Sequence, residues 1–201
     1  MFDSGDVMKE IIDVINNDGI VIMPTDTIYG IVAKATNEDV IKRVYSLKKR
    51  DDRKPMLILV SDNEMLKNYV SSINKVEQTL IDNLWPGPLT IIFDKKNISD
   101  LLTGGLSTVG IRIPNNKEML DIISSVGVPL LSTSVNLSGE KSATCVSNIN
   151  KTMLDNVDFV YDNGECNDVP STIIRVVNGE VKILREGIIS KEKIENVINK
   201  K

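Results

Sequence analysis

Three arginines define the chemistry that this sequence can offer, because a guanidinium keeps its charge in a protein. Arg112 stands inside an apolar, strand-like segment, Arg50 lies in a basic segment, and Arg185 follows the second strand of an expected hairpin. A buried arginine needs an anion, either from the protein or from a ligand. Its planar fork binds carboxylate or phosphate oxygens in pairs. Each arginine could therefore bind such an anion, and each is also open to a structural interpretation.

Hydroxyl and amide side chains follow two other apolar segments. Pro24–Gly30 reads Pro-Thr-Asp-Thr-Ile-Tyr-Gly, and Ser132–Asn136 reads Ser-Thr-Ser-Val-Asn and is followed by Ser138, Gly139 and Thr144. Such groups can bind an oxyanion, a sugar or another small polar ligand. The same residue types are also ordinary turn formers, so each segment alone is open to a purely structural interpretation.

The arginine segments have structural alternatives too. The basic segment 48–54 is compatible with the solvated carboxyl end of a helix, where the dipole favours positive charge. Arg185 has an adjacent acid, Glu186, that a surface ion pair would use. Arg112 is the hardest to explain structurally, because it interrupts an apolar strand.

The composition excludes several catalytic strategies. The chain has no histidine and two cysteines, Cys145 and Cys166. A histidine general base, a Ser-His-Asp or Cys-His unit, a histidine-bound zinc and a four-thiolate metal site are therefore excluded. With 24 Lys and Arg against 28 Asp and Glu, the net charge of −4 provides no overall attraction for nucleic acid. An anion site must therefore gather its cations locally.

The cellular compartment is indicated by sequence features that are absent. Few cysteines predict a reducing environment. The acidic amino terminus has no apolar signal segment, and no run of about 18 apolar residues occurs. We therefore expect a cytoplasmic protein that does not enter a membrane.

Hydrophobic periodicity predicts helices that alternate with short β-branched strands. The expected helices are 6–17, 37–48, 64–70, 76–84, 117–126, 147–155 and 190–198. The expected strands are 20–23, 29–35, 55–60, 89–93, 107–114, 129–132, 159–161, 171–177 and 180–184. Asn178-Gly179 predicts a tight hairpin between the last two strands, and residues 133–139 are expected in a loop. This alternation predicts a single α/β domain with one mixed sheet covered by helices, and ligands at its strand ends.

In their order along nearly the whole chain, these segments resemble the YrdC-type threonylcarbamoyl-adenylate synthases. The matching stretches are Pro24–Gly30, Lys48-x-Arg50, Trp85-Pro-Gly-Pro88, Arg112-Ile-Pro114, Ser134–Gly139, Asp162-x-Gly164, Ser171-Thr-Ile173 and Arg185-Glu-Gly187. Each stretch alone is weak evidence. So many matches in one order are not expected by chance.

The resemblance implies a fold and an activity. The fold is a single domain, 1–201, with a twisted mixed sheet flanked by helices, of the dihydroxybutanone-phosphate-synthase-like kind, and a concave basic pocket. The activity is that of a nucleotidyltransferase, which converts L-threonine, bicarbonate or CO2 and ATP into threonylcarbamoyl-AMP and pyrophosphate. Mg2+ is expected with the ATP, and no metal site in the protein. Further expected partners are the transferase machinery that modifies the adenosine beside the tRNA anticodon and, weakly, tRNA itself.

Carried over position by position, the resemblance implies roles for individual residues. The threonine contacts are Thr27, Arg112, Ser134 and Ser171. The nucleotide contacts are Arg50, Lys54, Thr108, Asn136, Thr144 and Arg185. The catalytic set is Lys48, Arg50, Ser134 and Asn136, with Lys48 assisting at the phosphates or the carbamate.

Two positions depart from the family pattern, and two other functions stay open. Asn116 and Leu59 stand where many or some relatives have histidine, which bears on the detail of threonine binding. A non-catalytic module for tRNA or double-stranded RNA is one alternative, although one Trp, four Tyr and three Phe supply few surfaces for base stacking. An inactive paralogue is the other, and retention of the catalytic set favours the enzyme.

Overall fold

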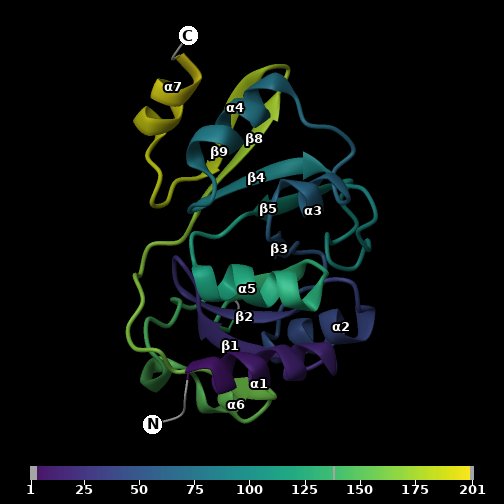
Figure 1. Cartoon of the computed structure of the whole chain (residues 1–201), viewed down its shortest axis with the longest axis vertical. Helices are drawn as coiled ribbons and strands as arrows, with labels where there is room; N and C mark the ends of the chain where they lie inside the picture. Colours follow the sequence, from purple (N-terminus) through teal and green to yellow (C-terminus); the bar gives the residue numbers. More distant parts are fainter. Residues whose placement is uncertain (1–3, 138, 200–201) are drawn as a thin grey trace.

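A nine-stranded mixed sheet organises the computed structural model, which describes residues 4–137 and 139–199 (Figure 1). The strands are β1 (Val21–Pro24), β2 (Tyr29–Lys34), β3 (Leu57–Leu59), β4 (Leu89–Asp94), β5 (Thr108–Arg112), β6 (Leu130–Ser134), β7 (Phe159–Val160), β8 (Thr172–Val177) and β9 (Glu180–Arg185). Their order is β7-β1-β2-β6-β3-β5-β4-β8-β9. The pairs β1–β7, β3–β5 and β4–β8 are parallel and the other neighbours antiparallel, which confirms the predicted mixed sheet.

Short helices connect and cover the strands. They are α1 (Ser4–Asn16), α2 (Glu38–Leu47), α3 (Asn63–Lys67), α4 (Lys75–Leu84), α5 (Lys117–Val126), α6 (Lys151–Leu154) and α7 (Lys191–Asn199), with a 3-10 turn η1 (Val146–Asn148). Asparagine side chains cap the first turns of α2, α4 and α5 by accepting main-chain N–H bonds. None of the helices in the described part of the chain has the length and apolarity needed to cross a membrane.

The predicted helix over 147–155 is wrong. The chain forms η1 and α6 there, because Ile149 adopts an extended conformation between them. The side chain of Asn150 then starts α6 by accepting a hydrogen bond from the Thr152 N–H. Asparagine side chains compete with the main chain for hydrogen bonds in this way, and here the competition splits one helix into two turns.

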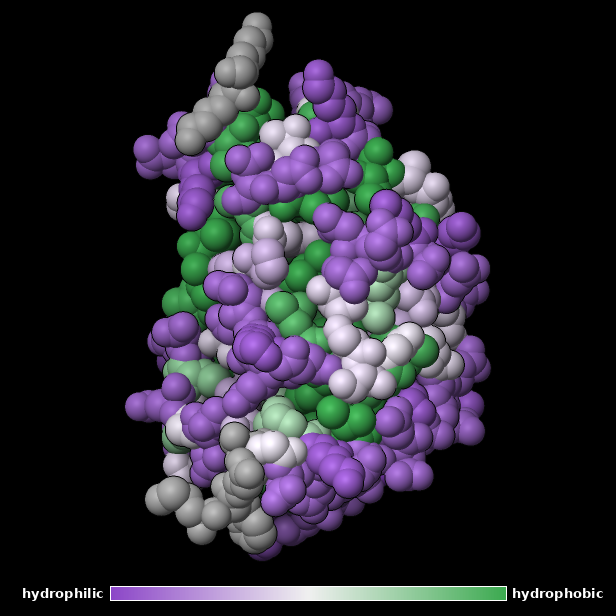
Figure 2. Space-filling model, viewed as in Figure 1, coloured by the Kyte–Doolittle hydropathy of each residue, from purple (hydrophilic) through white to green (hydrophobic). Residues whose placement is uncertain are grey.

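The alternation of side chains along the strands separates two hydrophobic cores. Val21 and Met23 of β1 pack with Val32 of β2 in a core beneath α1 and α5, which lie side by side (Figure 1). Ile20 and Ile22 belong to a second core on the opposite face, which also buries the apolar residues of α2 and α4. Viewed from the side of α5, hydrophilic side chains cover most of the margin, with hydrophobic atoms showing between them (Figure 2). Helices thus pack on both faces of the sheet.

Strand β6 is longer than its predicted range of 129–132. Thr133 and Ser134, expected in a loop, extend the strand because they pair with Ile31 and Gly30 of β2. The polar residues of this segment are therefore held by the sheet ladder, which gives their side chains defined directions. Ser138, part of the same predicted motif, lies outside the described residues.

The Asn178-Gly179 hairpin provides a test of local backbone control. Both residues have left-handed φ angles, 53° and 82°, as the tight turn between β8 and β9 requires. We expect Gly179→Ala to lower the free energy of unfolding by about 1 kcal/mol, because a Cβ is strained in this conformation. Urea denaturation measures the change. Asn178→Gly, which removes a strained Cβ, should lose nothing, and an equal loss in both variants would contradict a backbone origin.

Candidate functional site

A cavity of about 270 Å³ lies over one face of the sheet. Leu57 and Ser132, which line it, point to the same face as Leu59 and Leu130, two strand residues that pack with α1 and α5. The cavity thus occupies the part of this face that the two helices leave open. The lining also includes mid-strand residues such as Ile92 of β4, so the cavity is not confined to the strand ends.

Two glycines keep this part of the sheet hollow. A Cβ on Gly110 would lie 3.2 Å from both Ile92 Cδ1 and Thr90 Cγ2. A Cβ on Gly30 would lie 3.1 Å from Thr25 Cγ2 and 3.3 Å from Ser132 Oγ. Both glycines line the cavity, so larger residues there would crowd its floor and shift its other walls.

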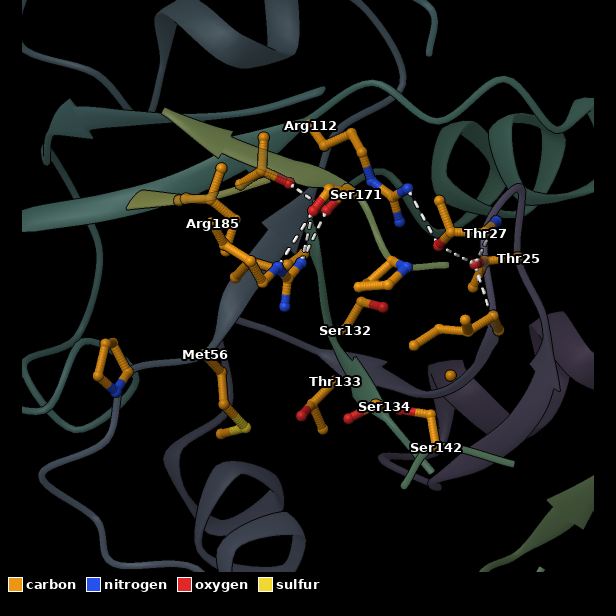
Figure 3. Close-up of a pocket in the computed structure, with 18 of the residues that line it drawn as sticks. Thr25, Thr27, Met56, Arg112, Ser132, Thr133, Ser134, Ser142, Ser171 and Arg185 are labelled. Carbon is orange, nitrogen blue, oxygen red and sulfur yellow. Dashed lines mark hydrogen bonds between the residues drawn. The ribbon is translucent and has the colours of Figure 1, made fainter. Parts of the chain in front are cut away.

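Arg50, Arg112 and Arg185 all line this one cavity, although they lie far apart in the sequence. In the close-up, the guanidinium groups of Arg112 and Arg185 lie on either side of Ser171 and border the same hollow (Figure 3). Burial lowers the pKa of Arg185, and the nearby charge of Arg112 lowers it further. The two cations are therefore close enough to repel one another across the cavity.

Neutral groups hold two of these three arginines. The Arg185 guanidinium donates to the main-chain oxygen of Ser171 at 2.8 Å and to its hydroxyl at 3.2 Å. Arg50 donates to the main-chain oxygens of Lys54 and Pro55. The ion pairs of the described residues involve neither Arg50 nor Arg185. Their positive charge is thus available to an anion in the cavity.

Arg112 is paired with an acid of the protein. Its NH1 lies 2.9 Å from Asp26 Oδ1, and the two side chains are only 3% and 4% exposed. The contact is an ion pair without hydrogen-bond geometry, because Asp26 Oδ1 has no hydrogen-bond partner among the described residues. Arg112 Nε, which is also buried, has no partner among them either. Arg112 NH1 donates instead to Thr27 Oγ1 at 3.3 Å. Of the two anion sources that the sequence left open, the structure thus supplies the protein's own.

Hydroxyl groups complete the polar side of the cavity. Thr25 Oγ1 and Thr27 Oγ1 lie 3.0 Å apart in the turn between β1 and β2 (Figure 3). Across the cavity, Thr90 Oγ1 and Ser171 Oγ lie 2.9 Å apart, and Ser134 also belongs to the lining. These groups can donate or accept, so they suit a ligand that carries both an ammonium and a carboxylate.

Lys48 lies outside the described lining of the cavity. The side chain is fully buried, and its Nζ donates to the main-chain oxygens of Ser134 and Asn136 and to Asn136 Oδ1. An ammonium has three hydrogens, so this turn uses all of them. Burial, with a smaller contribution from Arg50, lowers the pKa of Lys48 to about 7. In the described geometry Lys48 supports the 134–136 turn. Its expected role at phosphate or carbamate stays a prediction.

The structure brings together part of the expected site. Six of the expected residues line the cavity: Thr27, Arg50, Arg112, Ser134, Ser171 and Arg185. It places the others outside the described lining: Lys48, Lys54, Thr108, Asn136 and Thr144. Asn136 lies close by, since its Oδ1 accepts from Ser134 Oγ at 2.5 Å.

Sequence reasoning missed two contributors, Asp26 and Thr90. Asp26 stood in a motif of interest but was assigned no role, and Thr90 was treated as part of an apolar strand. A threonine inside Leu89–Phe93 is a signal that could have been used, because the hydroxyl is now found in the lining. Of the two departures from the family pattern, Leu59 is a buried core residue and Asn116 caps α5 through a bond from the Met119 N–H.

The mixed sheet and the cavity lined by three arginines define an α/β protein whose pocket carries positive charge. The comparisons with known proteins narrow this class. The family model for Sua5, YciO and YrdC, described as telomere recombination, matches residues 13–187. The chain belongs to this family.

Individual relatives cover most of the chain. A Methanocaldococcus jannaschii protein, which bears the name threonylcarbamoyl-AMP synthase provisionally, is 41% identical over 89% of this chain and 84% of its own. A Bacillus subtilis threonylcarbamoyl-AMP synthase is 34% identical over 89% of this chain but 53% of its own. The structure of Pyrococcus abyssi Sua5 complexed with L-threonine matches 99% of this chain and 59% of that one, with 29% identity and a TM-score of 0.93. The chain thus spans little more than half the length of the last two.

The buried lysine predicts a specific pH dependence of stability. Its pKa is about 7 in the folded protein against 10.5 for an ordinary lysine, so the unfolded chain holds more protons between these values. Stability relative to Lys48→Met should therefore rise by about 2 kcal/mol from pH 7 to pH 9. Denaturant unfolding at each pH measures it. Lys54→Met, at an exposed position, should show the same change of unfolding free energy with pH as the wild type. If Lys48→Met also shows the wild-type change, Lys48 does not titrate in this range.

Proposed function

We propose that this chain converts L-threonine, bicarbonate or CO2 and ATP into threonylcarbamoyl-AMP and pyrophosphate. The observation that carries the proposal is the convergence of Arg50, Arg112 and Arg185 on one cavity in a chain of net charge −4. A carboxylate, a bicarbonate and a triphosphate all need such a concentration of cations. The names of the M. jannaschii and B. subtilis relatives, and the threonine complex of the P. abyssi protein, support the same substrates.

The two ends of the cavity suit different substrates. Arg112, Thr27 and Ser171 offer a guanidinium and two hydroxyls to the carboxylate and hydroxyl of threonine. Arg50 and Arg185, which have no acid partner among the described residues, suit the phosphates of ATP. The lining also has an apolar part, made of Pro55, Met56, Leu57, Ile92 and Ile173, against which a purine ring can pack.

The reaction needs no enzyme nucleophile. The neutral amine of threonine attacks the bicarbonate carbon, and water leaves as the carbamate forms. A carbamate oxygen then attacks the α-phosphorus of ATP in line, and pyrophosphate leaves with the bonding electrons. Positioning and neutralisation of charge supply most of the catalysis in such transfers, so a chain without histidine can perform them.

Magnesium fits this scheme as a companion of ATP. The described residues contain no group of three or more acidic or cysteine side chains that could hold a metal ion. Asp26, the carboxylate beside the site, is engaged by Arg112. The phosphates and water would therefore provide the ligands of Mg2+, which would share the neutralisation of phosphate charge with Arg50 and Arg185.

The product is a mixed anhydride that another catalyst must consume. We propose that a threonylcarbamoyl transferase acting on the adenosine beside the tRNA anticodon takes this role. The described lining of the cavity contains no Phe, Tyr or Trp on which a base could stack, so direct readout of RNA in the cavity has little support.

The arginine placement predicts the outcome of an exchange assay. Wild-type protein should exchange labelled pyrophosphate into ATP only when threonine and bicarbonate are both present. Arg50→Ala should lower kcat/KM for ATP by the equivalent of about 2 to 4 kcal/mol, as the loss of one oxyanion donor does elsewhere.

The matched control is Arg175→Ala. Arg175 lies on β8 outside the described lining of the cavity, is half exposed and pairs with Asp94 at 3.5 Å. It should retain wild-type exchange. Wild-type protein without threonine-dependent exchange would overturn the proposed function, whereas equal losses in both variants would overturn only the placement of Arg50.

A further inference from the structure

We propose that Asp26 is a positioning residue, which holds the Arg112 guanidinium in the orientation that receives the substrate carboxylate. The inference rests on the proposed function for the identity of that substrate, threonine. Asp26 itself is outside the described lining of the cavity, so it acts through Arg112.

Asp26 uses both carboxylate oxygens to join two distant parts of the sheet. Oδ1 faces Arg112 NH1 at 2.9 Å, and Oδ2 accepts a hydrogen bond from the Asn115 N–H at 3.1 Å. Arg112 ends β5, and Asn115 lies just beyond it. Asp26 lies in the turn between β1 and β2, and β6 and β3 separate β2 from β5 in the sheet. Neighbouring strands are about 4.8 Å apart, so this turn must reach across two intervening strands to make the contacts.

Charge explains why Arg112 needs such a partner. A buried guanidinium without a counter-charge is strongly destabilising, and Arg185 adds repulsion from the other side of Ser171. Without Asp26, Arg112 would therefore turn away from Arg185 and leave the cavity. With Asp26 in place, the ion pair is made through NH1, and the buried Nε has no partner among the described residues. The guanidinium thus keeps an unused donor while its orientation is set.

The turn around Asp26 reinforces the same arrangement. Thr27 Oγ1 accepts from Arg112 NH1, and Thr25 Oγ1 accepts from the Thr27 N–H at 3.1 Å and donates to Ile28 O at 2.7 Å. Asp26 and Thr27 therefore contact the same nitrogen of Arg112 from one hydrogen-bonded turn. A rigid turn on one side and a rigid strand on the other leave Arg112 little freedom.

The direct test is titration calorimetry with L-threonine and, separately, with ATP. Asp26→Asn keeps an oxygen for the Asn115 N–H but removes the charge that orients Arg112. We expect it to weaken threonine binding about tenfold or more and to change ATP binding by less than about twofold. In the exchange assay, KM for threonine should rise by a similar factor while kcat at saturating threonine changes much less. Unchanged or tighter threonine binding would overturn the proposal, because Asp26 would then merely compete with substrate for Arg112.

Asp158→Asn is the matched control. Asp158 also pairs with an arginine, Arg43 at 2.7 Å, and its Oδ2 also accepts a main-chain N–H bond, from Ile20. It lies outside the described lining of the cavity. Asp158→Asn should bind threonine with wild-type affinity. If it weakens threonine binding as much as Asp26→Asn does, the effect of Asp26→Asn is general destabilisation and not a loss of Arg112 orientation.

A measurement without substrate tests the Asp26–Arg112 pair separately from the proposed function. The melting temperatures of wild type, Asp26→Asn, Arg112→Gln and the double variant form a cycle in which a real pair gives non-additive shifts. Additive shifts would overturn the pairing on which the inference depends. If wild type binds no threonine, the proposed function fails and Asp26 loses its substrate role, while the cycle still decides whether the pair exists. If Asp26→Asn does not fold, Asp26→Glu is measured instead. Wild-type threonine affinity of this variant, whose side chain is longer, would contradict a role of Asp26 in precise orientation.

Discussion

Charge compensation of the buried Arg112 guanidinium, which has a second guanidinium, that of Arg185, nearby, is the constraint on which the cavity depends. Arg112 and Arg185 border the same hollow on either side of Ser171, and Arg50 lines it as well. Arg112 is buried, whereas Arg50 is half-buried and Arg185 is exposed, so only Arg112 requires a counter-charge. Main-chain oxygens hold Arg50 and Arg185, and Asp26 holds Arg112. One carboxylate against three cations leaves a formal positive charge at the cavity, although the net charge of the chain is negative.

The sheet makes this arrangement possible through the two-residue period of its strands. On one face, Val32, Leu59 and Leu130 pack with the residues of α1 and α5, while on the same face Gly30 and Gly110 open the cavity. The alternation of side chains along the strands therefore places part of the hydrophobic core and the cavity on the same face of the sheet. The support extends below the face as well. Lys48 follows α2 and reaches under the end of β6, where it fastens the turn that carries Ser134.

Local patterns in the sequence predicted the elements better than the partners of individual side chains. Residue periodicity located the strands, and Asn178-Gly179 located the hairpin, because both signals act between near neighbours. The helix over 147–155 failed where Asn150 could form its own cap. Arg112 was singled out because a charge in an apolar strand needs an anion, but the choice of Asp26 depends on a contact across two other strands. Likewise, the burial of Lys48 depends on how α2 packs on β2, which brings the lysine to the end of β6, and no short motif encodes that packing.

Anchoring by neutral groups has a consequence for how anions bind. Since Arg50 and Arg185 already hydrogen-bond to main-chain oxygens, their positions do not depend on a ligand to hold them. A site whose cations are in place before binding loses less conformational entropy when the anion arrives and needs less reorganisation as charge develops. An acid in place of those carbonyls would hold the arginines equally well, but it would cancel the charge that the ligand needs. The use of one carboxylate, at the most deeply buried arginine, therefore separates two requirements: Arg112 must be compensated to be buried, whereas Arg50 and Arg185 must stay uncompensated to bind.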